Sequence, residues 1–226
     1  GTEVTVRQET DYPWDGHVKL KVTSPHAVRF NWYIRIPAWT KNQAVPSGLY
    51  SFKKHLNTKV VIRINGKKIN YRETKGYAVI PGKWESGDEI DLELPMQIRR
   101  IETNPLVVNN RGKIAVQRGP LVYCLEGIDH HNGFMFDYMI PDHSEIKNRY
   151  EKDLLNGVVT LTCKGKKAGK RSACKGHSLL RLEQPGSELY AGMDSPKPGH
   201  SHSKTRTHYC LKEQIRSFYW LVVRSE

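Results

Sequence analysis

Hydrophobic and polar side chains alternate one by one through much of the first half of the chain, which is the period of an extended strand. The run HVKLKVT places Val18, Leu20 and Val22 on one side of such a strand and Lys19 and Lys21 on the other. No stretch keeps the period of an amphipathic helix, and glycine and proline interrupt the pattern at short intervals. Short strands separated by frequent turns are typical of antiparallel sandwiches. We therefore predict an all-β protein.

Two groups of strand-like runs follow one another, and we predict an antiparallel, jelly-roll-like β-sandwich from each. The first sandwich covers residues 1–97, where Asn65 and Gly66 supply the φ > 0 positions of a tight hairpin. The second covers residues 98–165 and is expected to be incomplete, because it needs further elements to fill its sheets. Residues 166–226 lose the alternation and are predicted to form a basic, irregular tail. A chain of 226 residues is long enough for two such domains.

The chain carries a net charge of +13, which is typical of proteins that bind nucleic acid or another acidic polymer. The residues from Lys164 onward hold thirteen Lys or Arg and only five Asp or Glu, so most of the excess lies at the end. A basic nucleic-acid-binding protein is therefore an alternative that depends on the tail. For the sandwiches we expect no surface of interleaved aromatic and basic residues and no nucleic-acid partner. No apolar run approaches the roughly 18 residues of a membrane span, so we expect no membrane partner.

The stretch QETDYPWDG gathers Glu9, Asp11 and Asp15 beside two aromatic residues. A glycosidase needs two carboxylates that face each other across the scissile bond, usually from different elements. These three acids are instead neighbours in the sequence, and Pro13 and Gly16 are typical turn residues. We therefore interpret the stretch as the turn between two strands rather than as an active site.

The segment EGIDHH, residues 126–131, is a candidate metal site because imidazole and carboxylate groups ligate metal ions. Neighbouring residues of an extended chain point to opposite sides, so His130 and His131 reach one ion only across a sharp bend. We favour a polar loop. The four cysteines are far apart, with no C-x-x-C pair, and indicate neither a zinc site nor a disulfide framework.

The acidic run at residues 88–93 and Cys124 also favour structural roles. Alternation predicts that the acids of this run face solvent while the aliphatic residues between them face the core. The acids are Glu89, Asp91 and Glu93, and the aliphatic residues are Ile90, Leu92 and Leu94. Cys124 lies between two apolar residues and is predicted to be a buried packing residue rather than a nucleophile. The residues alone therefore indicate no catalytic set in this chain.

Several phrases resemble glycoside hydrolase family 127, in the region that follows the catalytic barrel of that family. This family includes non-reducing-end β-L-arabinofuranosidases and was formerly a domain of unknown function. The phrases occur in the family's order and are QETDYPWDGHVKL, YIRIPAW, INGKKI, GYAVIPGKWESGDEIDLELPM and VQRGPLVYCLEGID. The resemblance covers roughly Glu3 to Gly165. It implies that residues 1–97 are similar to the family's middle domain and residues 98–165 to part of its C-terminal domain.

The resemblance further implies an α/α barrel upstream that carries the chemistry of the family. In that barrel, cysteine thiolates and a glutamate hold zinc, and one cysteine is thought to attack the sugar. None of those residues matches a position of this chain, and Cys124 does not correspond to the nucleophile. We therefore expect no catalytic residue and no cofactor in this segment, with zinc in the barrel. The expected partners are the barrel of the parent chain and, through the parent enzyme, a plant-type glycan.

A stand-alone carbohydrate-binding module is the alternative function from a different class. Exposed aromatic rings stack on sugars, and Trp14, Trp39 and Trp84 are the candidates for such a platform. Saturable binding of a glycan to the isolated chain would favour this alternative over a scaffold.

The tail carries a separate hypothesis, because the resemblance stops there. When residues 176–196 are read one nucleotide later, permitted codons give a string that resembles the family's final strands. We therefore hypothesise that a frame slip between about Cys163 and Gly176 replaced those strands. Cys174, Cys210 and much of the positive charge would then have no selected function. Sequencing of the gene at this point tests the hypothesis.

Overall fold

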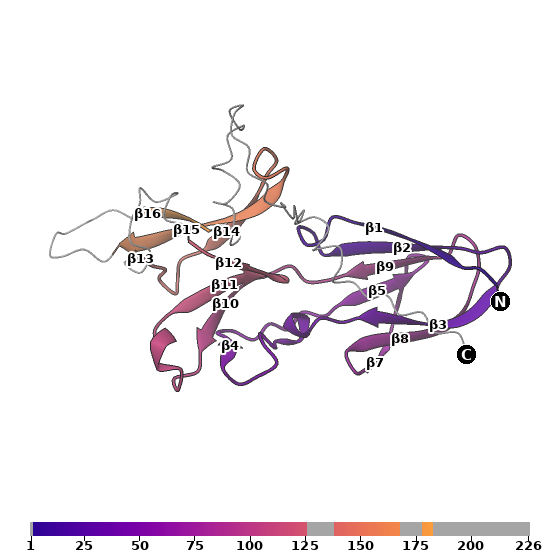
Figure 1. Ribbon diagram of the computed structural model, residues 1–226, viewed down its shortest axis with the longest axis horizontal. Helices are drawn as coiled ribbons and strands as arrows, with labels where there is room; N and C mark the ends of the chain where they lie inside the picture. Colours follow the sequence, from indigo (N-terminus) through magenta and orange to yellow (C-terminus); the bar gives the residue numbers. More distant parts are fainter. Residues whose placement is uncertain (1, 126–137, 168–177, 183–226) are drawn as a thin grey trace, which may run out of the picture. The chain divides into compact units, whose positions relative to one another are not determined.

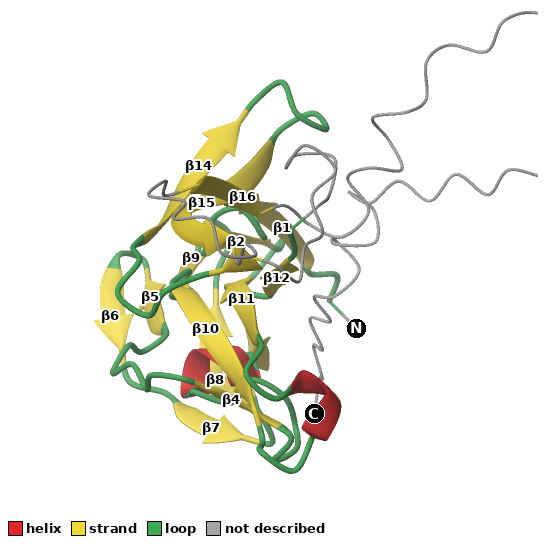
Figure 2. Ribbon diagram, turned by 90° about the vertical axis from the view of Figure 1, so that its left-hand side faces the viewer, coloured by secondary structure: helices red, strands yellow, loops and turns green. Residues whose placement is uncertain are grey.

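The computed structural model describes residues 2–125, 138–167 and 178–182 (Figure 1). These residues form antiparallel strands and two short 3-10 turns, η1 (Ala38–Lys41) and η2 (Val108–Asn110), drawn in red in Figure 2. The prediction of an all-β fold is thus confirmed. The chain divides into two compact units, and strand β10 (Ile98–Thr103) contributes its first three residues to the second unit and its last three to the first.

The first unit is a sandwich of two antiparallel sheets. The five-stranded sheet has the order β1 (Thr5–Thr10), β2 (His17–Thr23), β9 (Glu89–Glu93), β5 (Val61–Ile64) and β6 (Lys67–Ile69). The three-stranded sheet has the order β3 (Val28–Arg35), β8 (Tyr77–Trp84) and β7 (Arg72–Thr74). Strand β4 (Tyr50–Phe52) pairs with the last three residues of β10.

The core of this unit lies between the two sheets, where each strand buries every second side chain. Val18, Leu20 and Val22 are 2%, 3% and 0% exposed, as the alternation predicts. Ile90 and Leu92 on β9 are buried in the same way, whereas the acids between them point outward. The predicted solvated acidic face is therefore confirmed. At full burial, each of these aliphatic side chains stabilises the fold by about 1.5–3 kcal/mol.

The hairpin between β5 and β6 is the one that the sequence predicts. Asn65 has φ 49° and Gly66 has φ 78°, which are the left-handed positions of a two-residue turn. Asn65 also holds the loop before β9, because its side-chain oxygen accepts a hydrogen bond from the backbone N–H of Glu89 at 2.9 Å.

The second unit consists of shorter strands around a smaller core. They are β11 (Ile114–Arg118), β12 (Leu121–Tyr123), β13 (Tyr138–Met139), β14 (Ile146–Glu151), β15 (Val158–Lys167) and β16 (Ser178–Leu182). The long strand β15 pairs with β13, β14 and β16. Val116, Tyr123, Leu161 and Cys163 form the buried cluster. Cys124 is half-buried at the end of β12, so burial there is less complete than the apolar sequence predicts.

Part of the segment predicted as an irregular tail is paired strand. The last residues of β15 and the whole of β16 lie within residues 166–226, and Leu161 of β15 is opposite Leu182 of β16. Residues 168–177 and 183–226 lie outside the described residues, together with Cys174 and Cys210. The frame-slip hypothesis therefore stays a prediction.

Within the described ranges, no helix has the length and the apolar composition that crossing a membrane requires.

Candidate functional site

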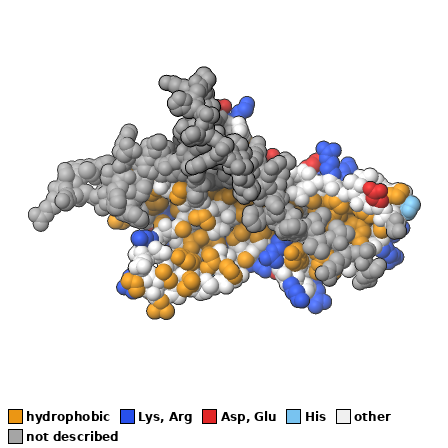
Figure 3. Space-filling view, in the orientation of Figure 1, with side chains coloured by type: hydrophobic (Ala, Val, Ile, Leu, Met, Phe, Trp, Pro, Cys, Tyr) orange, Lys and Arg blue, Asp and Glu red, His pale blue; other side chains and the backbone are white. Residues whose placement is uncertain are grey.

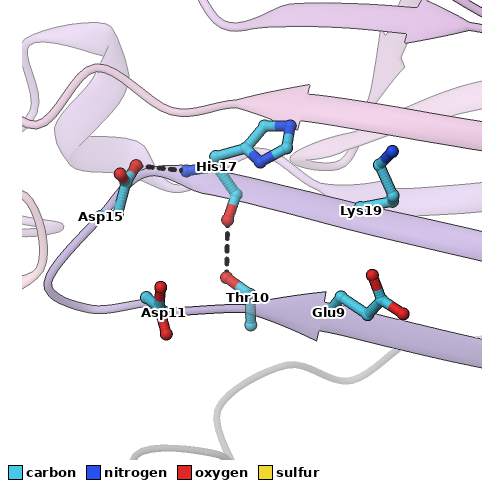
Figure 4. Close-up of a pocket in the computed structure, with 6 residues that line it drawn as sticks. All are labelled: Glu9, Thr10, Asp11, Asp15, His17 and Lys19. Carbon is cyan, nitrogen blue, oxygen red and sulfur yellow. Dashed lines mark hydrogen bonds between the residues drawn. The ribbon is translucent and has the colours of Figure 1, made fainter.

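A polar surface pocket lies on the first hairpin, at the stretch that holds the clustered acids. Its volume is about 370 Å³, and its lining is formed by Glu9, Thr10, Asp11, Asp15, His17 and Lys19 (Figure 4). The side chains come from the end of β1, the connecting loop and the start of β2. Carboxylates, a hydroxyl, an imidazole and an amine thus share one opening, which suits the binding of a polar ligand.

Hydrogen bonds within the hairpin engage several of these groups. The Thr10 hydroxyl donates to the backbone carbonyl of His17 at 2.6 Å, and Asp15 Oδ1 accepts from the backbone N–H of His17 at 2.9 Å. Both bonds are drawn in Figure 4. The backbone N–H groups of Trp14 and Asp15 donate to the carbonyl of Asp11 at 2.9 and 3.2 Å. The stretch is therefore a hydrogen-bonded turn between β1 and β2, and the predicted turn is confirmed.

Gly16 is required where the turn returns to the sheet. Its carbonyl accepts a hydrogen bond from the backbone N–H of Leu94 at 2.9 Å. A Cβ atom at this position would lie 2.0 Å from the Leu94 carbonyl oxygen and 2.8 Å from the Met96 side chain. Glycine lets the backbones at Gly16 and Leu94 approach closely, because any side chain at Gly16 would push the two segments apart.

The cationic side of the pocket is paired with acids of β9. Lys19 Nζ lies 3.2 Å from Glu89 Oε2, and Lys21 Nζ lies 3.4 Å from Glu89 Oε1. The hydrogen bond from Lys19 is the largest cause that lowers the pKa of Glu89, and the same bond raises the pKa of Lys19. His17 Nε2 lies 3.2 Å from Asp91 Oδ1. The lysine and the histidine of the pocket are thus engaged by β9 rather than aimed at a substrate.

Trp84, one of the three tryptophans predicted to contact sugar, is a core residue. It is 3% exposed, and its indole N–H donates to the backbone carbonyl of Phe30 at 3.0 Å. Its ring packs edge-on against Trp32, with the centroids 5.9 Å apart and the planes at 86°. A stacking sugar needs an open ring face, and burial leaves none here. Trp84 is therefore removed from the candidates, since even-numbered residues of β8 face the core.

Trp14 and Trp39 remain as candidates for sugar contact. Trp14 is half-buried in the turn after β1, next to Asp15 of the pocket. Trp39 is half-buried on η1 and packs against the core of the first unit. Trp84 forms no shared platform with these two residues, because its ring is buried in the core.

The other sequence candidates add no metal-binding set among the described residues. In that part of the chain, no three or more His, Cys, Asp or Glu side chains come together as metal ligands. Residues 126–131, the EGIDHH segment, lie outside the described ranges. Cys163 is 3% exposed, and burial raises the pKa of its thiol, which disfavours the reactive thiolate.

The sequence reasoning missed one polar surface, the outer face of the three-stranded sheet. Tyr33 and Tyr77 lie on this face, and the Arg35 guanidinium carbon lies 5.2 Å from the centre of the Tyr77 ring. Arg35 Nη1 also donates to the carbonyls of Lys75 and Gly76 at 3.4 Å each. The odd-numbered residues of VRFNWYIR could have indicated this face, because alternation applies to β3 as it does to β2.

Comparison with protein families matches nearly the whole described chain. Residues 1–96 match the domain described as β-L-arabinofuranosidase, GH127 middle domain. Residues 98–191 match the glycoside hydrolase family 127 C-terminal domain.

Individual proteins that are similar to this chain are β-arabinofuranosidases. A non-reducing end β-L-arabinofuranosidase of Bifidobacterium longum subsp. longum is 29% identical over 204 residues, which are 87% of this chain and 26% of that protein. A solved GH127 β-arabinofuranosidase has a TM-score of 0.70 at 29% identity, covering 80% of this chain and 28% of its own. The crystal structure of a GH127 β-L-arabinofuranosidase from Geobacillus stearothermophilus T6 has a TM-score of 0.67 at 33% identity, with the same coverage.

Proposed function

We propose that this chain, which belongs to glycoside hydrolase family 127, serves as the non-catalytic β-sandwich part of a β-L-arabinofuranosidase-like enzyme. The observation that carries this proposal is that the matches are to the middle and C-terminal domains. The chain spans about a quarter of the length of the curated relative, 26%, and 28% of the solved relatives. The hydrolase activity belongs to relatives that are several times longer.

The state of the polar groups supports a structural role for the first hairpin. Asp15 accepts a backbone hydrogen bond, His17 pairs with Asp91 and Lys19 pairs with Glu89. A retaining or inverting glycosidase needs one carboxyl that donates a proton and a second one across the sugar. Groups that are engaged in turn and sheet contacts are better suited to hold a hairpin than to exchange protons.

The catalytic α/α barrel, its zinc and a plant-type glycan substrate are the remaining parts of the proposal. They follow from the family, in which the chemistry resides in the barrel. The described residues of this chain offer no cluster of zinc ligands. The sandwiches would then support the barrel, and the glycan would be bound through the parent enzyme.

A chimera tests the supporting role directly. In the Bifidobacterium longum relative, the 204-residue segment that matches this chain is deleted in one variant and replaced by this chain in another. Hydrolysis of a chromogenic β-L-arabinofuranoside is then measured. We expect the deletion to abolish activity and the replacement to restore it, because the supplied part has the same fold.

The isolated chain is assayed in parallel with the same substrate. No turnover above the buffer blank is expected from it. Turnover by the isolated chain would contradict the proposal, and so would a soluble, folded chimera that remains as inactive as the deletion.

A further inference from the structure

The outer face of the three-stranded sheet combines tyrosines with basic residues. The register pairs Tyr33 with Val79 and Arg35 with Tyr77, and it places Arg72 of β7 opposite Val79. Residues that are directly opposite on neighbouring strands share one face of a sheet. The members of this face are Arg29, Asn31, Tyr33, Arg35, Arg72, Thr74, Tyr77, Val79, Pro81 and Lys83, which we call the arginine-tyrosine face. This face differs from the expectation that the sandwiches lack interleaved aromatic and basic residues.

The outer face of the five-stranded sheet provides an internal comparison, since several of its cations are paired with acids. Lys19 and Lys21 pair with Glu89, and Arg63 lies 2.6 Å from Glu93. Figure 3 shows the mixture of basic and acidic side chains along the upper edge of this unit, where β1 and β2 lie in Figure 1. Oppositely charged neighbours on this face satisfy one another.

The arginines of the arginine-tyrosine face have no such acids. Within the described part of the chain, Arg29, Arg35 and Arg72 form no ion pair with a carboxylate, and Lys83 pairs with Glu85 at 3.4 Å. Basic side chains gather at the lower edge of this unit near β7 in Figure 3. All four cations are exposed. The three arginines therefore present positive charge to solvent that no ion pair neutralises within the described residues.

Arg35 is held in place before any ligand binds. Its Nη1 atom donates to two backbone carbonyls, and its guanidinium lies over the Tyr77 ring. A Cβ atom on Gly76 would lie 2.4 Å from Arg35 Nη1, so the glycine makes room for this arrangement. A guanidinium has five N–H donors, and Nη2 and Nε keep theirs for an acid. Fixing the group in advance reduces the entropy lost on binding.

We propose that the arginine-tyrosine face binds a polysaccharide that carries carboxylates. The arginines would pair with the acid groups, and the tyrosine hydroxyls between them would hydrogen-bond to the sugar hydroxyls. Arg29 and Arg35 are six residues apart on one strand, which corresponds to roughly 20 Å. This spacing fits repeated charges along a polymer better than a single sugar acid.

The same observations favour a polysaccharide over a single-stranded nucleic acid. Nucleic-acid bases stack on open aromatic faces. Here Arg35 covers one face of Tyr77, and both tyrosines are half-buried against the sheet. Membership of a glycoside hydrolase family points to a sugar polymer as well. The inference goes beyond the proposed function, because a supporting domain needs no glycan site of its own.

Binding of the full 226-residue chain to polygalacturonate tests the inference, with neutral arabinan and single-stranded oligo-dT as the other probes. Isothermal titration compares the wild type with Arg35→Gln/Arg72→Gln. The matched control is Arg7→Gln/Arg63→Gln, which removes the same charge from the five-stranded sheet. Since Arg35 contacts the turn at Gly76, Arg72→Gln alone is a second test variant, and thermal unfolding checks every variant.

We expect saturable binding of polygalacturonate that weakens about tenfold or more in the test double variant and less than about twofold in the control. Arg72→Gln alone should weaken binding by about threefold or more at an unchanged melting temperature. Neutral arabinan should not bind. Equal weakening in both double variants, tighter binding of oligo-dT, or no binding of polygalacturonate would overturn the inference. None of these outcomes bears on the chimera, whose readout is hydrolysis.

Discussion

The two units bury cores of different size and chemistry with the same kind of antiparallel strand. Among the described residues, the buried cluster of the first unit contains fifteen hydrophobic residues, including Phe30, Trp32 and Trp84. The cluster of the second unit contains four, and two of these, Tyr123 and Cys163, carry ionisable groups. Alternation in a sequence therefore predicts a strand, but the size of a core depends on how much apolar surface faces that strand.

The first prediction breaks the aromatic centre of the larger core. Trp84→Ala removes a ring that contacts Phe30 and Trp32, and we expect a loss of about 3–5 kcal/mol in the free energy of unfolding. Urea unfolding monitored by far-UV circular dichroism measures the loss. Trp39→Ala is the control, because Trp39 is half-buried at the edge of the same core. An equal loss in both variants would contradict the assignment of Trp84 to the centre.

The second prediction applies the same truncation to the smaller core. Leu161 is 0% exposed on β15, and Leu161→Ala should lower the free energy of unfolding by about 2–4 kcal/mol. Modification of the buried Cys163 thiol reports on this unit when the other three cysteines are replaced by serine. Lys164→Ala, at an exposed position of the same strand, is the control and should leave the modification rate unchanged. Unchanged protection of Cys163 in Leu161→Ala would show that the cluster does not stabilise the unit.

The third prediction uses the ionisable character of the second core. Burial raises the pKa of Tyr123 to about 12, and its hydroxyl is buried without a hydrogen-bond partner among the described atoms. The phenol loses its proton more readily in the unfolded chain than in the folded one. Its contribution to the free energy of unfolding is therefore fully present below pH 10 and is lost as the pH rises from 10 toward 12. The loss should reach about 2–3 kcal/mol.

Unfolding curves recorded between pH 9 and pH 12 test the Tyr123 prediction, with Tyr123→Phe as the control. The phenylalanine variant has no proton to lose and leaves no polar group unsatisfied, so it should be at least as stable at neutral pH. An identical alkaline loss in both proteins would assign the effect to other groups.

The fourth prediction concerns the close approach at the first hairpin. Gly16→Ala places a methyl group against the Leu94 carbonyl and should cost about 1–3 kcal/mol, because the backbone must shift. Gly48→Ala is the matched control, since a Cβ atom there meets nothing within 4 Å. Thermal unfolding gives the melting temperatures of the two variants. An unchanged melting temperature in Gly16→Ala would mean that the turn shifts without cost.

The smallest expected effect is at the surface of the larger unit. Hydrogen bonds from Lys19 and Lys21 lower the pKa of Glu89 below its ordinary value of 4.5. A lowered pKa stabilises the fold above the ordinary value, and this contribution disappears as the pH falls below 4.5 through the lower folded value. Glu89→Gln should therefore flatten the acid limb of the stability curve slightly. A variant with the same acid limb as the wild type would show that exposure cancels the effect.

Local pattern predicted much of the fold and little of the candidate surfaces. The inward side chains of β2 and β9 and the Asn65-Gly66 turn followed from alternation and backbone sterics. By residue type Trp84 is a candidate for stacking on sugar, whereas its position on β8 places it in the core. Residue type indicates what a side chain can do, but only its neighbours determine whether it is exposed to do it.

The arginine-tyrosine face shows the limit most clearly. Arg35 and Arg72 are far apart in the sequence, and they share a surface only because β3 and β7 both pair with β8. That neither arginine forms an ion pair with a carboxylate, within the described residues, likewise depends on which strands are neighbours.

The sequence by itself determined the strands, their inward sides and the family, because alternation, turn sterics and short motifs are local. Only the tertiary structure decided which strands are neighbours, which tryptophan is buried and which charges are left without partners. These properties depend on contacts between residues that are distant along the chain, and no local pattern encodes such contacts.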